Sequence, residues 1–130
     1  MIDKRGKVYQ GFGEFLTAFV HDLNAMSEDG WSVLVEGVRD ERALRMLGFE
    51  GMLVTVSRVG REGTKAFGGA KKVVLLTDLD REGAVLAARF VKRLGHDGMR
   101  VSLQERRRLK AASKGVFLHV ENLSRFAKSD

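Results

Sequence analysis

Apolar residues near the start of the chain recur at steps of three and four, a period that predicts an amphipathic helix. The segment is GFGEFLTAFVHDLNAMSEDG, residues 11–30, and its periodic apolar positions are Phe12, Phe15, Leu16, Phe19, Leu23 and Met26. We expect the helix to end near Gly30, because glycine readily ends a helix. Its apolar side is expected to cover one face of a sheet.

Four short apolar runs follow this helix, and their length and β-branched content predict strands. They are SVLVE (32–36), MLVTV (52–56), KVVLLT (72–77) and MRVSL (99–103). The glycine-rich segment 57–69, directly after the second run, is expected to form a loop.

Helical patterns alternate with these strands. The segment DERALRMLG is predicted to be a helix, with Asp40 as its N-cap and Gly48 as its stop. The segment 81–95 is predicted to be a second helix, closed by Gly95, with one apolar face formed by Ala87, Phe90, Val91 and Leu94.

The C-terminal part of the chain has one clear helical segment and one ambiguous one. Residues 104–113 are predicted to be helical, whereas the period of residues 116–127 is compatible with a strand followed by a helix or with a single helix. The alternation of strands and helices indicates an α/β fold with a four-stranded parallel sheet flanked by helices on both faces. We expect the common strand order 2-1-3-4.

Composition and charge narrow the class of protein. The chain has 130 residues, enough for one domain, with 44% hydrophobic and 31% charged residues, the composition of an ordinary globular protein. Lys and Arg total 23 against 17 Asp and Glu, so the formal net charge is +6 and polyanions are the natural partners. Without cysteine there is no disulfide framework or thiolate metal site. Neither a membrane span nor an apolar signal core is visible, so we expect a cytoplasmic protein.

Acidic residues end two of the predicted strands. Glu36 ends the first, and Asp78 and Asp80 follow the third. In the order 2-1-3-4 the first and third strands are neighbours, so the three carboxylates are expected to meet at the edge where such sheets bind ligands. Carboxylates that converge repel one another unless a divalent cation keeps them ionised, and Mg²⁺ prefers carboxylate oxygens. The sequence therefore predicts a magnesium site.

The structural alternative is that these acids only cap helices. A single Asp after a strand is often an N-cap, and Asp40 is expected to be one and no more. Asp78 and Asp80 cannot both cap the same helix, which favours a metal site for the pair. Surface or core roles are favoured over metal binding for His21, His96 and His119, and packing roles for Tyr9 and Trp31.

Two motifs resemble the Toprim domain of type IA topoisomerases, bacterial-type primases, OLD-family nucleases and small ribosomal-RNA maturation nucleases. They are VLVEG (33–37) and TDLDREG (77–83), and the similarity spans residues 32–103. The resemblance implies a compact Rossmann-like Toprim fold, Glu36 as general acid or base or as metal ligand, and Asp78 and Asp80 as ligands of one or two Mg²⁺ ions, with Mn²⁺ as a substitute. It implies three parts of one domain: an N-terminal helical segment 1–30, the Toprim domain 31–112 and a C-terminal segment 113–130.

Departures from these families limit the activities that we expect. Strand passage needs a tyrosine on a further domain, and Tyr9 is the only tyrosine. Priming needs an additional fold, for which 130 residues leave no room. The ribosomal-RNA nucleases carry a further C-terminal region, so we do not expect the same substrate here. We therefore expect a minimal Toprim protein that hydrolyses phosphodiester bonds in RNA or DNA, with Glu36 moving the proton. The rival interpretation is a non-catalytic, magnesium-dependent nucleic-acid-binding module, or a subunit of a larger processing or repair complex.

Basic residues predict where nucleic acid binds. Arg58, Arg61 and Lys65 lie in the predicted glycine-rich loop, and Arg81 follows the acidic pair. Residues 104–114 add a basic segment with one acid, Glu105, against Arg106, Arg107, Arg108, Lys110 and Lys114. This segment is equally compatible with a polyanion-binding face and with a solvated helix.

Three other α/β classes fit the sequence less well. A haloacid-dehalogenase-like phosphatase carries its DxD on the first strand, and a receiver domain carries its acidic pair there. In this chain two predicted strands precede the pair. A dinucleotide-binding fold needs a glycine fingerprint after the first strand, and EGVRDE does not provide one.

Overall fold

The computed structural model describes the backbone of residues 4–127 and the side chains of residues 11–127. Five α-helices, four strands and two 3-10 helices are assigned in this part of the chain. In order they are α1 (Lys4–Glu28), β1 (Trp31–Val35), α2 (Val38–Met46), β2 (Leu53–Thr55), α3 (Val56–Glu62), η1 (Gly63–Phe67), β3 (Lys72–Leu76), α4 (Arg81–His96), β4 (Arg100–Ser102), α5 (Gln104–Ser113) and η2 (Val120–Phe126).

The four strands form one parallel sheet in the order β2-β1-β3-β4, as the alternating pattern predicted. The register pairs Val35 of β1 with Leu76 of β3 and with Thr55 of β2. Because β1 and β3 end level with each other, the residues that follow them emerge at the same edge of the sheet. The acids at these two strand ends are thereby brought together.

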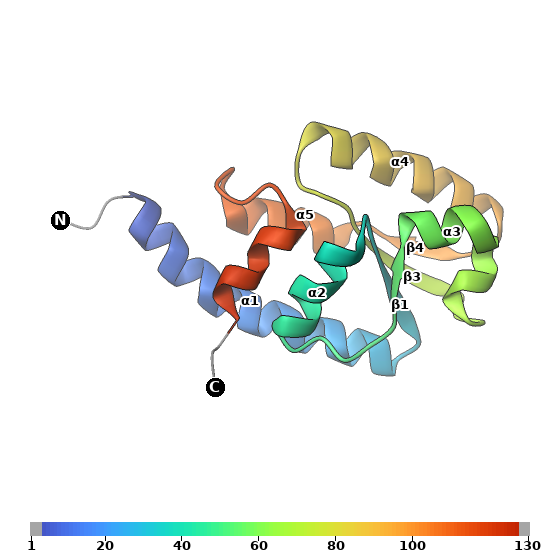
Figure 1. The fold of residues 1–130 in the computed structure, drawn as a ribbon, viewed down its shortest axis with the longest axis horizontal. Helices are drawn as coiled ribbons and strands as arrows, with labels where there is room; N and C mark the ends of the chain where they lie inside the picture. Colours follow the sequence, from blue (N-terminus) through green and yellow to red (C-terminus); the bar gives the residue numbers. More distant parts are fainter. Residues whose placement is uncertain (1–3, 128–130) are drawn as a thin grey trace.

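Helices cover both faces of the sheet (Figure 1), and successive strand residues alternate between two apolar clusters. Val33 and Val35 face the cluster built from α1, α2, α5 and η2, whereas Leu34 faces the cluster built from α3, η1 and α4. The N-terminal helix α1 contributes Phe12, Leu16, Phe19 and Leu23 to the same cluster that holds Phe117, Val120 and Leu123 from the C-terminal segment. The two ends of the chain therefore share one core.

Several element boundaries differ from the predictions. Helix α1 extends beyond the periodic segment 11–30 at its N-terminal end, since it begins at Lys4, and it ends at Glu28, close to the predicted stop at Gly30. The segment 57–69 is a short helix and a 3-10 turn rather than a loop, because the Thr55 side chain caps α3 by accepting from the Arg58 N–H. Helix α4 passes through Gly95 and ends at His96, and the left-handed residue that follows is Gly98, with φ +85°.

The ambiguous segment 116–127 contains neither a regular strand nor an α-helix. Extended residues lead into the 3-10 helix η2, which packs closely against α2. No helix in the described part of the chain is both long enough and apolar enough to cross a membrane.

Candidate metal centre

The turn from β3 into α4 carries the two predicted aspartates and is held by hydrogen bonds at both ends. The buried Thr77 hydroxyl donates to the Gly83 carbonyl at 2.7 Å. Asp80 is the N-cap of α4, and its Oδ1 accepts the Gly83 N–H at 2.7 Å. Asp80 thus has the capping role of the structural alternative, but Oδ2 is not used by the cap.

Gly83 is required by a close backbone approach. A Cβ at this position would lie 1.8 Å from the Asp78 carbonyl oxygen, a distance that real side chains do not reach. The first turn of α4 therefore lies directly against the backbone that carries Asp78. This contact fixes the relative positions of Asp78 and Asp80.

Arg106 of α5 binds the same turn through its guanidinium group. Its guanidinium is buried, with 7% of the residue exposed, and it donates to backbone oxygens on either side of Leu79. Nη2 reaches the Asp78 carbonyl at 2.6 Å and the Asp80 carbonyl at 3.4 Å, and Nε reaches the Thr77 hydroxyl at 3.1 Å. The prediction that Arg106 lies on a basic surface is wrong, because this face of α5 packs under the turn.

Glu36 reaches the same turn from the neighbouring strand. Its Oε2 accepts the Asp78 N–H at 2.7 Å, so the contact predicted between the two strand ends exists. Burial raises the pKa of Glu36 above its usual value, and the nearby charges of Asp78, Asp40 and Asp80 raise it further, against the lowering effect of the Asp78 N–H. The carboxylates are therefore close enough to repel one another.

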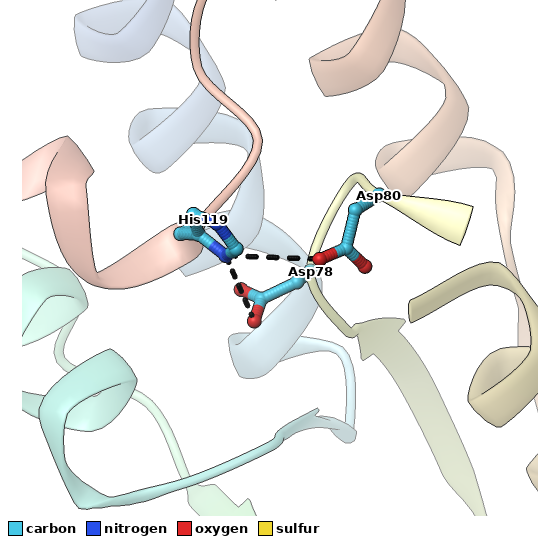
Figure 2. A group of neighbouring side chains, drawn as sticks. All are labelled: Asp78, Asp80 and His119. Atoms are coloured by element: carbon cyan, nitrogen blue, oxygen red, sulfur yellow. Dashed lines mark ion pairs between the residues drawn. The ribbon is translucent and has the colours of Figure 1, made fainter. Parts of the chain in front are cut away.

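His119 completes a group that the sequence did not predict (Figure 2). Its Nδ1 lies 3.5 Å from Asp78 Oδ2 and 3.8 Å from Asp80 Oδ2. Two backbone contacts hold the C-terminal segment here: the Val120 N–H donates to Asp78 Oδ1 at 2.8 Å, and the Leu79 N–H donates to the Leu118 carbonyl at 2.6 Å. The adjacent Asp78 carboxylate raises the pKa of His119, which favours its charged form.

Asp78, Asp80 and His119 form a group that can hold a metal ion. One ligand atom from each lies within 4.8 Å of the other two. Asp78 and Asp80 each bind a backbone N–H with one carboxylate oxygen and turn the other toward His119. Carboxylate and imidazole donors suit several divalent cations. Glu36 lies next to this group but is not one of its three members.

A cleft of about 480 Å³ opens beside the group. Its lining includes Glu36, Asp78 and His119, together with Arg39 and Asp40 of α2. The prediction that Asp40 is the N-cap of α2 is wrong. Asp40 is the third residue of the helix, and the N-cap is Gly37, whose N–H donates to Asp40 Oδ2 at 3.0 Å. Burial raises the pKa of Asp40 above its usual value.

None of the basic residues predicted to bind nucleic acid lines this cleft. Arg61 and Lys65 are exposed on α3 and η1, and Arg81 is exposed at the start of α4. Arg58 is paired with Glu62 at 2.9 Å. On α5, Arg107 and Arg108 are exposed, and Arg108 lies 3.4 Å from Asp22. Among the described residues, none of these side chains forms an ion pair with Glu36, Asp78 or Asp80.

Sequence reasoning missed His119 as a neighbour of the aspartates. His21 and His96 are exposed, as expected, and the side chain of His119 is also half exposed, at 49%. No spacing within the sequence links residue 119 to residues 78 and 80, because the link is a tertiary contact between Leu118 and Leu79. Trp31 packs at the edge of the core, as predicted, and Tyr9 lies outside the residues whose side chains are described.

Comparison with known proteins gives sequence relatives and a similar fold. No family model matches the chain. The UPF0292 protein of Pyrococcus abyssi is 32% identical over 113 residues, 86% of each chain, and that of Thermococcus gammatolerans is 33% identical over 86% of this chain and 85% of its own. A solved protein structure from Aquifex aeolicus superposes with a TM-score of 0.68 at 27% identity, covering 81% of this chain and 94% of that one.

Proposed function

The chain belongs to the UPF0292 family, and we propose that it is a Toprim-type enzyme that uses a divalent metal ion to hydrolyse phosphodiester bonds in RNA or DNA. The observation that carries the proposal is the meeting of Asp78, Asp80 and His119 next to Glu36, at the carboxyl edge of a parallel sheet. Ligands of parallel α/β proteins bind at this edge. The motifs VLVEG and TDLDREG supply all the acids of this centre.

The donor set fits a metal ion that accepts both oxygen and nitrogen ligands. Two carboxylate oxygens suit Mg²⁺ and Mn²⁺, and an imidazole shifts the preference away from Mg²⁺ toward transition metals. We propose Mg²⁺ or Mn²⁺, held by Asp78 and Asp80 with His119 as the third ligand. Such an ion, when bound, polarises a phosphate group and offsets the charge on the departing oxygen.

In this proposal Asp78 and Asp80 bind the metal ion, and Glu36 transfers the proton. Asp78 and Asp80 are pre-oriented, since each has one oxygen fixed by a backbone N–H. Glu36 lines the cleft, and one of its carboxylate oxygens makes no hydrogen bond with any residue whose side chain is described. This oxygen is placed to accept or donate the proton that hydrolysis moves.

The test is a cleavage assay on purified protein. Structured RNA, single-stranded DNA and supercoiled DNA are incubated with Mg²⁺, with Mn²⁺ or with chelator, and the chemistry of the product ends is determined. We expect cleavage only with metal, and we expect Asp78→Asn to abolish it. Absence of cleavage of every substrate with either metal would contradict the enzymatic proposal.

One observation favours the alternative, a non-catalytic nucleic-acid-binding module. Every carboxylate of the centre already has a structural partner: Glu36 and Asp78 each accept a backbone N–H, and Asp80 caps α4. Glu36→Gln distinguishes the two functions. An enzyme loses cleavage with this substitution but keeps nucleic-acid binding, whereas a binding module has no cleavage to lose.

A further inference from the structure

We propose that the surface where α2 meets η2 binds the backbone of a single nucleic-acid strand, beside the phosphodiester that reacts, through Arg39 and Arg42. This inference rests on the proposed function, and it adds where the substrate lies and which form of it is bound. The basic residues expected from the sequence do not supply this surface, since none of them lines the metal cleft.

A second hollow lies next to the metal cleft and continues it. Its volume is about 240 Å³, and its lining includes Arg39, Arg42, Met46, Asn122 and Ser124. Arg39 and Glu121 line both hollows. A strand whose reacting phosphate lies at the aspartates can therefore leave the cleft past Arg39 and continue over α2. Figure 1 shows α2 and the C-terminal helix side by side at this place.

The two guanidinium groups are available for a ligand. Arg39 and Arg42 are exposed, and neither forms an ion pair with any carboxylate among residues 11–127. They are three residues apart on one helix, so their Cβ atoms are about 5–6 Å apart. Arg45, one turn further along, differs: its Nη1 donates to the Phe49 carbonyl at 2.9 Å, and its guanidinium stacks on the Phe49 ring.

The charge around the metal cleft makes such a contact necessary. Glu36, Asp40, Asp78 and Glu121 line the cleft and repel a phosphate, and Arg39 is its only arginine or lysine among the residues described. A metal ion offsets this repulsion at the reacting phosphate alone. The flanking phosphate needs another cation, and a guanidinium binds phosphate with two parallel hydrogen bonds.

The rest of the hollow suits a nucleotide rather than a bare phosphate ion. Met46 is 60% exposed and offers apolar surface to a sugar or base, and Asn122 offers both a donor and an acceptor. Helix α2 has nine residues and is about 13 Å long. Two cations on so short an element suit a few nucleotides of one strand rather than an extended duplex.

The test is fluorescence anisotropy with a labelled 12-nucleotide single-stranded oligonucleotide, in Ca²⁺ and in chelator, at several salt concentrations. We expect Arg39→Gln/Arg42→Gln to weaken binding at least about tenfold, because two charge-assisted contacts are lost. The slope of log affinity against log salt should become shallower by about 1.4, the value for two phosphates on a single strand.

The matched control is Arg89→Gln/Arg93→Gln, which removes two exposed arginines from α4 on the other face of the sheet. Both double variants lower the net charge equally, so equal losses of affinity would overturn the inference and indicate a general charge effect. Failure of the wild-type protein both to bind and to cleave any nucleic acid would overturn the proposed function itself.

Arg39→Lys/Arg42→Lys keeps the test decisive if the Gln variant does not fold. We expect this variant to keep the salt dependence of the wild-type protein and to lose about threefold in affinity, since lysine keeps the charge but not the bidentate geometry. A loss of salt dependence despite the retained charge would contradict the inference.

Discussion

Two strands border the cleft, and each passes into a helix through a turn that holds an aspartate, but the two turns use that aspartate in opposite ways. Between β1 and α2, Asp40 lies inside the helix as its third residue, 6% exposed, and its Oδ2 accepts the Gly37 N–H. Between β3 and α4, Asp80 lies just outside the helix, and its Oδ2 points toward His119. A shift of three positions, from the third residue of a helix to its N-cap, thus separates the buried Asp40 from Asp80, which is turned toward His119.

The glycines of the two turns differ as well. Nothing lies within 4 Å of a Cβ built on Gly37, whereas a Cβ on Gly83 would collide with the backbone of Asp78. Arg106 adds hydrogen bonds beneath the second turn. The turn that carries Asp78 and Asp80, the candidate metal ligands, is therefore the more rigidly packed of the two, as a preorganised site requires.

The largest expected effect compares the two glycines. Gly83→Ala should lower the free energy of unfolding by about 3 kcal/mol, because the added methyl group must push α4 away from the turn. Gly37→Ala should cost less than about 1 kcal/mol, since its φ of −150° and its open surroundings accept alanine. Urea unfolding of both variants measures the difference. Equal stabilities would show that the two turns are packed alike.

The next effect concerns Arg106 and its exposed neighbour. Arg106→Gln should cost about 2 kcal/mol, since a buried carbonyl that loses its donor keeps the full desolvation penalty. Arg107→Gln, with the same change of charge, should cost less than about 0.5 kcal/mol. Thermal unfolding measures both. A large loss at Arg107 instead would contradict the role of Arg106 as the support of the turn.

The two aspartates provide the third contrast. Asp80→Asn should change the free energy of unfolding by less than about 0.5 kcal/mol, because asparagine caps a helix as well as aspartate does. Mn²⁺ affinity should nevertheless fall at least about tenfold, or 1.4 kcal/mol, with the loss of a charged ligand. Asp40→Asn should leave Mn²⁺ affinity within about threefold, because its carboxylate is held by the Gly37 N–H. Calorimetric titration with Mn²⁺ separates the two variants.

The smallest expected effect is at His119. His119→Ala should leave the stability nearly unchanged, because the side chain is half exposed and the segment is held by its backbone. It should lower Mn²⁺ affinity more than Mg²⁺ affinity, since imidazole favours transition metals. His96→Ala, at an exposed site away from the group, is the control. Equal losses for both ions would show that His119 does not select the metal.

Much of the fold was predictable because it depends on patterns that are local along the chain. The four apolar runs predicted the strands, and their alternation with helices predicted the parallel order 2-1-3-4. The positions of Glu36 and Asp78 at neighbouring strand ends follow from that order alone. The end residues of helices were predicted less well: Gly37 rather than Asp40 is the N-cap of α2, and α4 continues through Gly95 to His96.

The details of the candidate centre were not predictable in the same way. In α5, Glu105 and Arg106 are buried although both are charged, so the binary pattern of residues 104–113 does not reveal which side faces the core. Arg106 faces inward because its guanidinium donates to the carbonyl oxygens of the turn after β3. Arg39 was likewise overlooked, since nothing in its local sequence links it to η2.

The sequence by itself determined the sheet, the acids at its edge and the net positive charge, because the periodicity of each strand and helix is local along the chain and their alternation restricts how the strands can be arranged. Only the tertiary structure decided which residues join those acids. His119 and Arg106 reach the aspartates through segments 26 or more positions away along the chain. Hydrogen bonds to backbone groups of the 77–80 turn and to the Asp78 carboxylate hold both segments in place, and the donors and acceptors of that turn become available only once the sheet has formed.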